Sequence, residues 1–251
     1  MEATEDPTKS LAIPPGATLG MMQPYFLPYT GYFSLIMATD AWIVHDSVQF
    51  MKQGWIERNR ILKPGEGWQY FSVPLIKHSH RALIRDVMIA VEKPWQKMIF
   101  AQLTHYHRRA PHYAEVVEFL NDSFKYETSS ITKLNTHLMK AVCSYIGIDF
   151  TPYIYSEMNL IHEEVTDPAD WALSISRALN ARGYINPPGG VELYDREKFE
   201  RGGINLQFLR NNLRPYNQRR PAFEPALSII DTMMFCSPEE IKGMISDYEL
   251  F

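Results

Sequence analysis

The stretch from residue 18 to residue 46 constrains the fold more than any other part of this sequence. Its apolar residues 18–22 (Thr-Leu-Gly-Met-Met) predict a buried strand, and residues 41–44 (Ala-Trp-Ile-Val) predict a second one. Between them, Pro24 and Pro28 exclude a regular helix or a central strand, and residues 31–38 predict a short buried helix. Strand, loop, helix and strand in this order form a βαβ unit, whose strands are parallel and whose connection is right-handed.

The rest of the chain continues the alternation of helix and strand signals. We predict strands over residues 68–75, 84–91, 153–155, 184–186 and 205–209, and helices over residues 94–109, 111–124, 131–145, 167–183 and from 238 onward. Asp167 with Pro168, and Ser237 with Glu240, are typical helix starts. Residues 47–61 indicate a polar and aromatic connection. We therefore predict an α/β fold: a mostly parallel sheet flanked by helices, with a Rossmann-like N-terminal βαβ unit and a helical C-terminal portion.

Composition limits the domain organisation and the partners. The 251 residues are enough for one large core, and no run approaches the 18 apolar residues of a membrane-spanning helix. The net charge of −4 argues against a duplex nucleic-acid binder. We predict a flexible leader over residues 1–17, which are polar and aperiodic, and a single domain over residues 18–251. With two cysteines and an acidic N-terminal stretch unlike a secretory signal, we expect a cytoplasmic location.

Aromatic residues are concentrated in the loop after the first predicted strand. Residues 23–33 contain five of them: Tyr25, Phe26, Tyr29, Tyr32 and Phe33. In open parallel sheets, ligands bind beyond the carboxyl ends of the strands, which is where this loop lies. Two interpretations remain open. The loop is either the wall of a ligand site, formed by Gln23, Tyr25, Tyr29 and Tyr32, or a hydrophobic lid whose hydroxyls reach water.

Polar residues that could act on a ligand follow the second predicted strand. Asp46 comes directly after it, so we expect this carboxylate to converge with the aromatic loop and, beside Gln49, to bind a hydroxyl or accept a proton. The alternative is an aspartate that caps a turn. A third group of candidates follows: Trp55, Arg58, Asn59 and Arg60. The tryptophan ring could stack on a sugar or base, and the arginines could bind phosphate or carboxylate. The alternative is a solvated, positively charged surface segment.

Two later segments supply further candidates. Gly189 and Gly190, with Tyr194 nearby, allow a backbone to approach a ligand closely or simply form a turn. Asp231 lies inside an apolar run after Gln218, so its carboxylate has to be paired or exposed.

Metal and thiol chemistry receive less support. The histidine spacings do not predict a complete ligand set, so we predict no metal site. Cys236 precedes a predicted helix, a position that lowers the pKa of a thiol, but no histidine partner is evident in the sequence.

The order of these motifs resembles the WbqC-like protein family. Its opening is similar to residues 22–33, Met-Gln-Pro-Tyr-Phe-Leu-Pro-Tyr-Thr-Gly-Tyr-Phe. The likeness continues at Asp46-Ser47-Val48-Gln49-Phe50, Trp55, Arg58-Asn59-Arg60-Ile61, Gly189-Gly190 with Tyr194, Tyr216 with Gln218, and Leu227-Ser228-Ile229-Ile230-Asp231. Members of this family sit among proteins of bacterial surface-polysaccharide (O-antigen) biosynthesis, and the resemblance implies transfer of a glycyl group to an amino sugar.

Three functions remain as alternatives. The first is a transferase that moves an aminoacyl or acyl group from an activated donor to an amino sugar, with Asp46 as base, Gln49 and Asn59 as positioning residues, and Arg58 and Arg60 binding an anionic group. The second is an ATP-dependent enzyme that adenylates or ligates an amino acid. The third is a non-catalytic sugar-binding module. We expect a small-molecule partner, either a nucleotide-linked amino sugar or an amino acid, and leave the oligomeric state open.

The second alternative comes from a weaker resemblance. Residues 29–32, Tyr-Thr-Gly-Tyr, stand where some nucleotidyltransferases have a His-x-Gly-His motif. Both histidines are replaced by tyrosine, which is neutral at pH 7 and cannot stabilise phosphates as a charged histidine does. The replacement argues against adenylyl transfer but leaves a nucleotide-binding fold open.

Overall fold

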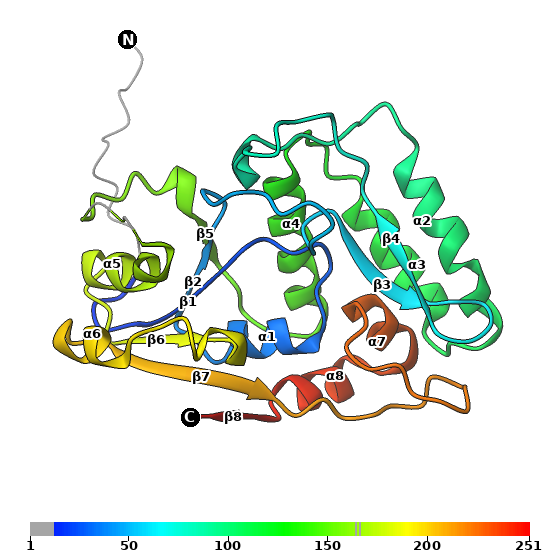
Figure 1. The fold of residues 1–251 in the computed structure, drawn as a ribbon. Coiled ribbons are helices and arrows are strands. Elements are labelled where there is room, and N and C mark those ends of the chain that lie inside the picture. The colour runs from blue at the N-terminus through cyan, green and yellow to red at the C-terminus, as the bar shows by residue number, and fades with distance from the viewer. Residues whose placement is uncertain (1–12, 164, 166) are drawn as a thin grey trace, which may run out of the picture.

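A six-stranded sheet forms the centre of the molecule in the computed structural model, which describes residues 13–163, 165 and 167–251 (Figure 1). In spatial order its strands are β5 (Pro152–Ile154), β2 (Ala41–Val44), β1 (Thr18–Met22), β6 (Gly183–Asn186), β7 (Asn205–Asn211) and β8 (Tyr248–Leu250). Only β8 is antiparallel to its neighbour. The predicted α/β fold with a mostly parallel sheet is therefore confirmed.

The N-terminal βαβ unit also forms as predicted. Helix α1 (Thr30–Met37) connects β1 to β2, and Met22 pairs with Val44, so both strands end at the same edge. Strand β6 pairs with the other side of β1. Because α1 and the helix that follows β6 cover opposite faces of the sheet, the carboxyl ends of β1 and β6 form a topological switch point.

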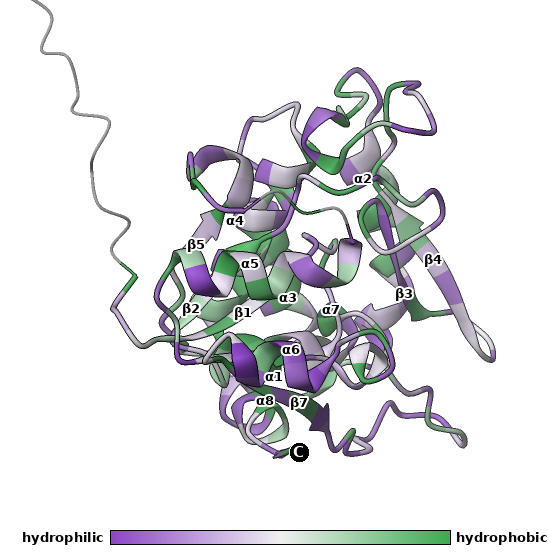
Figure 2. Ribbon diagram, turned by 60° about the vertical axis from the view of Figure 1, so that its left-hand side comes forward, coloured by the Kyte–Doolittle hydropathy of each residue, from purple (hydrophilic) through white to green (hydrophobic). Residues whose placement is uncertain are grey.

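Helices cover both faces of the sheet. One face packs against α1, α4 (Ile131–Tyr145) and α8 (Pro238–Ile245), whereas the other packs against α5 (Trp171–Ala178) and α6 (Arg196–Arg201). Side chains alternate along β2 accordingly, with Trp42 in the first core and Ile43 in the second. In Figure 2 the central strands β1 and β2 are largely green, while the surrounding loops show much more purple.

A long insertion between β2 and β5 builds the side of the molecule on the right of Figure 1. Its elements are the antiparallel hairpin β3 (Arg58–Leu62) and β4 (Trp68–Ser72), the 3₁₀ helices η1 (Ile84–Asp86) and η2 (Thr104–Arg108), and the helices α2 (Trp95–Leu103), α3 (Tyr113–Ser123) and α4. Helix α7 (Ile229–Phe235), from the C-terminal part of the chain, contacts both α3 and β3. The remaining short helices are η3 (Tyr155–Glu157), η4 (Pro168–Asp170) and η5 (Pro188–Gly190).

Three local predictions were wrong. Strand β3 lies in residues that we predicted to form a connection. Its polar sequence gives no strand signal, and it forms a strand because it pairs with β4. Residues 84–91 form η1 and isolated bridges, since their buried side chains anchor a loop rather than a strand. The helix expected to stop at Gly183 ends at Ala178, and Asn180 takes the left-handed conformation (φ 51°).

The predicted leader falls into two parts. Residues 1–12 lie outside the described residues. The segment that follows is packed: Ile13 and Ala17 are buried in the second core, and the amide of Gly16 donates to the carbonyl of Asn180 at 2.8 Å. Within the described part of the chain, no helix is long and apolar enough to cross a membrane.

Candidate functional site

Hydrogen bonds to its carbonyl oxygens hold the segment 23–29, called here the aromatic loop. Asn59 on β3 donates through Nδ2 to the carbonyls of Phe26 and Leu27, both at 3.0 Å. Asn135 on α4 donates through Nδ2 to the carbonyl of Pro24 at 2.8 Å. Both asparagines are buried, so water does not compete for these bonds. Asn135 was missed by the sequence reasoning, because a polar residue on the buried face of a helix carries no motif.

The start of α7 holds the other end of the aromatic loop. The hydroxyl of Ser228 donates to the carbonyl of Leu27 at 2.7 Å, and the amide of Ile229 donates to the carbonyl of Pro28 at 2.9 Å. Leu27 itself has a φ of 43°, a left-handed conformation that a leucine keeps only where its surroundings determine it. The loop is therefore rigid before any ligand arrives.

This rigid loop forms one wall of a cavity of about 160 Å³, called here the aromatic cavity. Its lining residues are Tyr25, Pro28, Tyr29, Trp55, Asn59, Arg60 and Ala226. Five of the residues predicted from the sequence thus come together: the two tyrosines, Trp55, Asn59 and Arg60. Ala226 was missed, because a single alanine in a loop carries no signal. An apolar cavity of about 150 Å³ holds benzene, so this one has room for a single six-membered ring.

The Arg60 guanidinium supplies a positive charge beside the aromatic cavity. Its Cζ lies 5.4 Å from the ring centre of Trp55 and 5.0 Å from that of Trp68, both within cation–π range. One Nη donates to the carbonyl of Ala226 at 2.9 Å. Its buried Nε has no hydrogen-bond partner among the described residues. Two rings and one carbonyl thus hold this cation in place.

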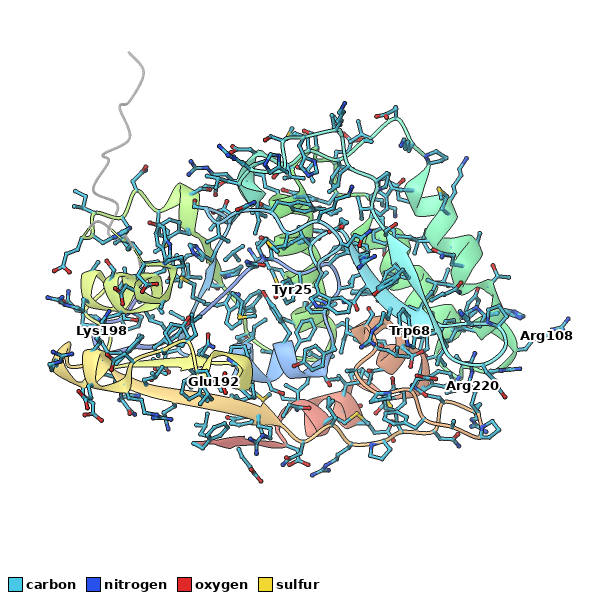
Figure 3. The ribbon with its side chains drawn as sticks, viewed as in Figure 1. Tyr25, Trp68, Arg108, Glu192, Lys198 and Arg220 are labelled. Carbon is cyan, nitrogen blue, oxygen red and sulfur yellow. The ribbon has the colours of Figure 1, made fainter. Side chains whose placement is uncertain are left out.

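The two tyrosines of the cavity keep their protons at neutral pH. Burial raises the pKa of Tyr25, and Tyr29 raises it further; burial also raises the pKa of Tyr29. Figure 3 shows Tyr25 above α1, near the middle of the molecule. Tyr29 stands at the start of α1, where a Cβ on Gly31 would lie 2.5 Å from the Tyr29 ring. Because that ring covers the first turn, the N-terminus of α1 is not free to receive a phosphate.

Gln23 and Tyr32 do not line the aromatic cavity. Gln23 follows β1 and is half-buried. Tyr32 is fully buried on α1, and its hydroxyl donates to the carbonyl of Gln23 at 2.7 Å. Tyr32 therefore stabilises the start of the loop, and its predicted contact with a ligand is not part of this geometry.

Asp46 does not line the aromatic cavity, although the amide of His45 donates to the carbonyl of Met22 at 2.8 Å and so places Asp46 beside the start of the aromatic loop. The carboxylate of Asp46 is buried and accepts hydrogen bonds from the backbone amide of Ser156 at 3.1 Å and from the hydroxyl of Ser156 at 2.6 Å. It borders a separate pocket of about 310 Å³. Its hydrogen-bond partner Ser156 follows the carboxyl end of β5, so the geometry favours the alternative of a capping aspartate.

Gln49 and Arg58, the other two residues predicted to be catalytic, line a third pocket of about 700 Å³. Gln49 donates through Nε2 to the carbonyl of His80 at 2.8 Å. Arg58 donates to the carbonyls of Gln53 and Gly54, and its Cζ lies 3.9 Å from the ring centre of Tyr70. Both side chains thus hold neighbouring loops and are separate from the aromatic cavity.

The glycines after β6 have different surroundings. A Cβ on Gly190 would lie 2.1 Å from Nδ2 of Asn186, so that position requires glycine for packing alone. Gly189 has no atom within 4 Å of its Cβ position and faces open space. Tyr194 packs against Tyr184 and Phe199, with ring centres 5.9 and 5.6 Å away. These residues lie near the switch point but do not line the aromatic cavity.

Gln218 and Asp231 do not line the aromatic cavity but belong to a buried hydrogen-bond network. The carboxylate of Asp231 accepts from the hydroxyls of Tyr106 and Tyr216, both at 2.5 Å, and from Nε2 of Gln218 at 3.0 Å. The Tyr106 hydroxyl also accepts the amide of Leu62 on β3 at 2.9 Å. Burial raises the pKa of Asp231 to about 6, although these three donors and a nearby arginine lower it. The network joins α7 to the hairpin and to η2.

The prediction of a low pKa for Cys236 was wrong. Burial raises it to about 12, and the carboxylates of Glu240 and Asp231 act in the same direction. Cys236 is 3% exposed, so burial outweighs the start of α8. Within the part of the chain that is described, no group of three or more acidic, histidine or cysteine side chains could hold a metal ion.

Comparison with known proteins places these residues in a family. The WbqC-like protein family matches residues 23–243, a span that contains the aromatic loop and every residue of the aromatic cavity. The chain belongs to the WbqC-like protein family. This WbqC-like chain is 30% identical over 219 residues to "Uncharacterized protein Rv1507c" of Mycobacterium tuberculosis, an overlap of 86% of this chain and 92% of the relative. No solved structure matches significantly.

Proposed function

We propose that this WbqC-like protein binds a sugar ring in the aromatic cavity and transfers an aminoacyl or acyl group to an amino substituent of that sugar. The observation that carries the proposal is the cavity itself, with its single-ring volume, rigid aromatic walls and fixed guanidinium. The flat faces of Tyr and Trp rings pack against the C–H face of a sugar, and Arg60 suits a hydroxyl or an anionic substituent.

Rigidity of the walls supports binding. The carbonyls of the aromatic loop are already bonded to Asn59, Asn135 and Ser228, so a ligand does not have to order them. Holding one reactant in a fixed orientation also supplies part of the rate enhancement of a transfer reaction. These properties suit an enzyme and a tight sugar-binding site alike.

The cavity residues have distinct roles in this proposal. Tyr25 and Tyr29 keep their protons, so their hydroxyls orient the sugar by donating and accepting hydrogen bonds rather than by acting as bases. Arg60 binds the sugar substituent that carries negative charge or a lone pair. The proton of the attacking amine is not assigned to Asp46, because that carboxylate is occupied by Ser156. The acyl part of the proposal is supported by the family resemblance.

The test combines binding with product detection. Isothermal titration calorimetry measures the binding of amino sugars and nucleotide-linked amino sugars to the full chain, and it works equally for a variant that lacks Trp55. Mass spectrometry then follows the acylated sugar when glycine with ATP and magnesium, or an acyl thioester, is supplied. Trp55→Ala should abolish binding and product, whereas the matched control Tyr126→Ala, at a 41% exposed position outside the cavity, should keep both.

The alternatives give different results in the same experiment. Sugar binding without any product identifies a sugar-binding module. A rise in melting temperature with ATP and magnesium alone, unaffected by Trp55→Ala, favours the ATP-dependent enzyme. Failure of every sugar to bind refutes the proposal.

A further inference from the structure

A further pocket, called here the arginine pocket, lies at the turn of the β3–β4 hairpin. Its volume is about 590 Å³, and it is lined by Arg109, which follows η2, and by Arg219 and Arg220 of the segment between β7 and α7. Opposite these arginines lies the hairpin turn 64–67. Figure 3 shows Arg220 close to Trp68, and Arg220 donates through Nη1 to the carbonyl of Gly67 at 3.0 Å.

The positive charges of this pocket are not neutralised by direct partners. Among the residues that the structure describes, none of these three arginines lies within 4.0 Å of a carboxylate oxygen. Nε and Nη2 of Arg220 are buried without a hydrogen-bond partner. Three arginines and two carboxylates, Glu66 and Glu224, line the pocket, and the charge of Arg220 also acts on the buried carboxylate of Asp231. An anion in this pocket would be attracted by the guanidinium groups that line it, because guanidinium forms charge-assisted hydrogen bonds with anions.

The charges of Arg109 and Arg220 both act on the side chain of His105. Burial lowers the pKa of this histidine, and Arg220 and Arg109 lower it further, against a raising effect from the carbonyl of Gln102. A neutral His105 adds no charge of its own. The positive charge in the lining of the pocket therefore comes from Arg109, Arg219 and Arg220.

The backbone of the pocket suits close contact with an anion. No atom beyond its chain neighbours lies within 4 Å of the Cβ position of Gly65, and Gly67 has a φ of 71°, so the backbone is open at these two positions between the side chains of Pro64 and Glu66. On the other wall, Arg219 has a φ of 54°, and its amide donates to Oδ1 of Asn217 at 2.9 Å. That turn fixes the direction in which the arginine pair is presented.

We propose that the arginine pocket binds the phosphate groups of a phosphorylated sugar, such as a nucleotide sugar, whose ring occupies the aromatic cavity. This inference rests on the proposed function for the identity of the ring. The two pockets adjoin: Trp68, which follows Gly67 of the arginine pocket, lies against Arg60 of the aromatic cavity, and Glu224 and Ala226 border one pocket each. Guanidinium groups bind phosphate through two parallel hydrogen bonds, and two or three of them suit a diphosphate.

The first experiment uses inorganic pyrophosphate as the probe. Isothermal titration calorimetry on the full chain should show binding, and Arg109→Ala/Arg219→Ala should weaken it about 100-fold, or about tenfold for each lost guanidinium. Neither of these side chains has a protein partner among the described contacts, so the variant should keep its melting temperature. The matched control Arg81→Ala/Arg108→Ala removes the same charge from exposed positions outside the pocket and should change affinity less than about twofold.

Two results would overturn the phosphate site: no binding of pyrophosphate to the wild type, or equal weakening by the control pair. A second arm separates this inference from the proposed function. Trp55→Ala should leave pyrophosphate affinity unchanged, because Trp55 does not line the arginine pocket. If no sugar binds but pyrophosphate binding still depends on Arg109 and Arg219, the proposed function fails and the phosphate site stands.

A third arm tests the link between the two pockets. The wild type should bind a nucleotide-linked amino sugar more tightly than the free amino sugar, by about tenfold or more, and Arg109→Ala/Arg219→Ala should remove that advantage. A nucleoside diphosphate without the sugar identifies how much of the affinity comes from the phosphates alone. Equal affinity of the wild type for the free and the linked sugar refutes the link.

Discussion

The buried carboxylate of Asp231 should make the stability of this protein depend on pH in an unusual direction. Its pKa is about 6 in the folded chain, against 3.8 for an ordinary aspartate, because burial outweighs the donors Tyr106, Tyr216 and Gln218. As pH rises from about 4 to about 6, the unfolded chain loses this proton while the folded chain keeps it. The folded state then loses stability through this window and levels off above it.

The size of the effect follows from the difference between the two pKa values. A difference of about two pKa units corresponds to about 3 kcal/mol of unfolding free energy. The folded state loses most of this stability between pH 4 and pH 6. Asp231→Asn removes the titration but keeps the shape of the side chain. In the variant an NH2 group replaces one carboxylate oxygen, so one of the two tyrosine hydroxyls that donate to Asp231 loses its acceptor. The cost of that loss does not depend on pH.

Urea unfolding at a series of pH values measures the effect. The difference in unfolding free energy between wild type and Asp231→Asn should change by about 2.5 kcal/mol between pH 4 and pH 7, moving in favour of the variant as pH rises. The control Asp86→Asn, at a position where the side chain is 62% exposed, should keep a nearly constant difference from the wild type. A constant difference for Asp231→Asn over this range would refute the reasoning.

Three further predictions test other parts of the molecule. Asp46→Ala should lower the unfolding free energy by about 1–3 kcal/mol, because the amide and hydroxyl of Ser156 lose their acceptor, yet it should leave sugar binding intact; loss of binding with unchanged stability would contradict the capping role. Cys143 and Cys236, whose pKa values burial raises to about 12, should react with a thiol reagent at pH 8 only after unfolding; rapid labelling of the native protein would refute this. Gly190→Ala should cost about 1–3 kcal/mol in urea unfolding, because its Cβ would overlap Asn186, whereas the control Gly189→Ala should cost little.

Local sequence patterns predicted the elements that local physics controls. The buried strands, the proline loop and the N-terminal caps at Asp167 and Ser237 depend on neighbouring residues, and the structure confirms each of the two caps by its hydrogen bond. Strand β3 was missed, since a polar strand depends on its partner in the hairpin. The end of α5 was misplaced at Gly183, because glycine and asparagine can both end a helix. The helix ends before Asn180, and Gly183 is the first residue of strand β6.

The candidate site divides in the same way. Tyr25, Tyr29, Trp55, Asn59 and Arg60 were found from the sequence, because aromatic and guanidinium groups in a loop at a strand end are unusual without a ligand or a packing role. Their assembly into one cavity was not contained in that pattern. It depends on Asn135 and Ser228, whose hydrogen bonds to the loop join segments more than 100 residues apart.

By itself, the sequence determined the mostly parallel α/β architecture, the position of the aromatic loop after the first strand, and the family of the chain. The tertiary structure alone decided which polar groups face a cavity and which are buried or hydrogen-bonded to other groups of the protein. Asp46, Asp231 and Cys236 each look reactive in sequence, yet a serine, two tyrosines and burial determine their state. The physical reason is that periodicity and capping act between neighbours in the chain, whereas desolvation and hydrogen-bond partners are set by residues that only the fold brings together.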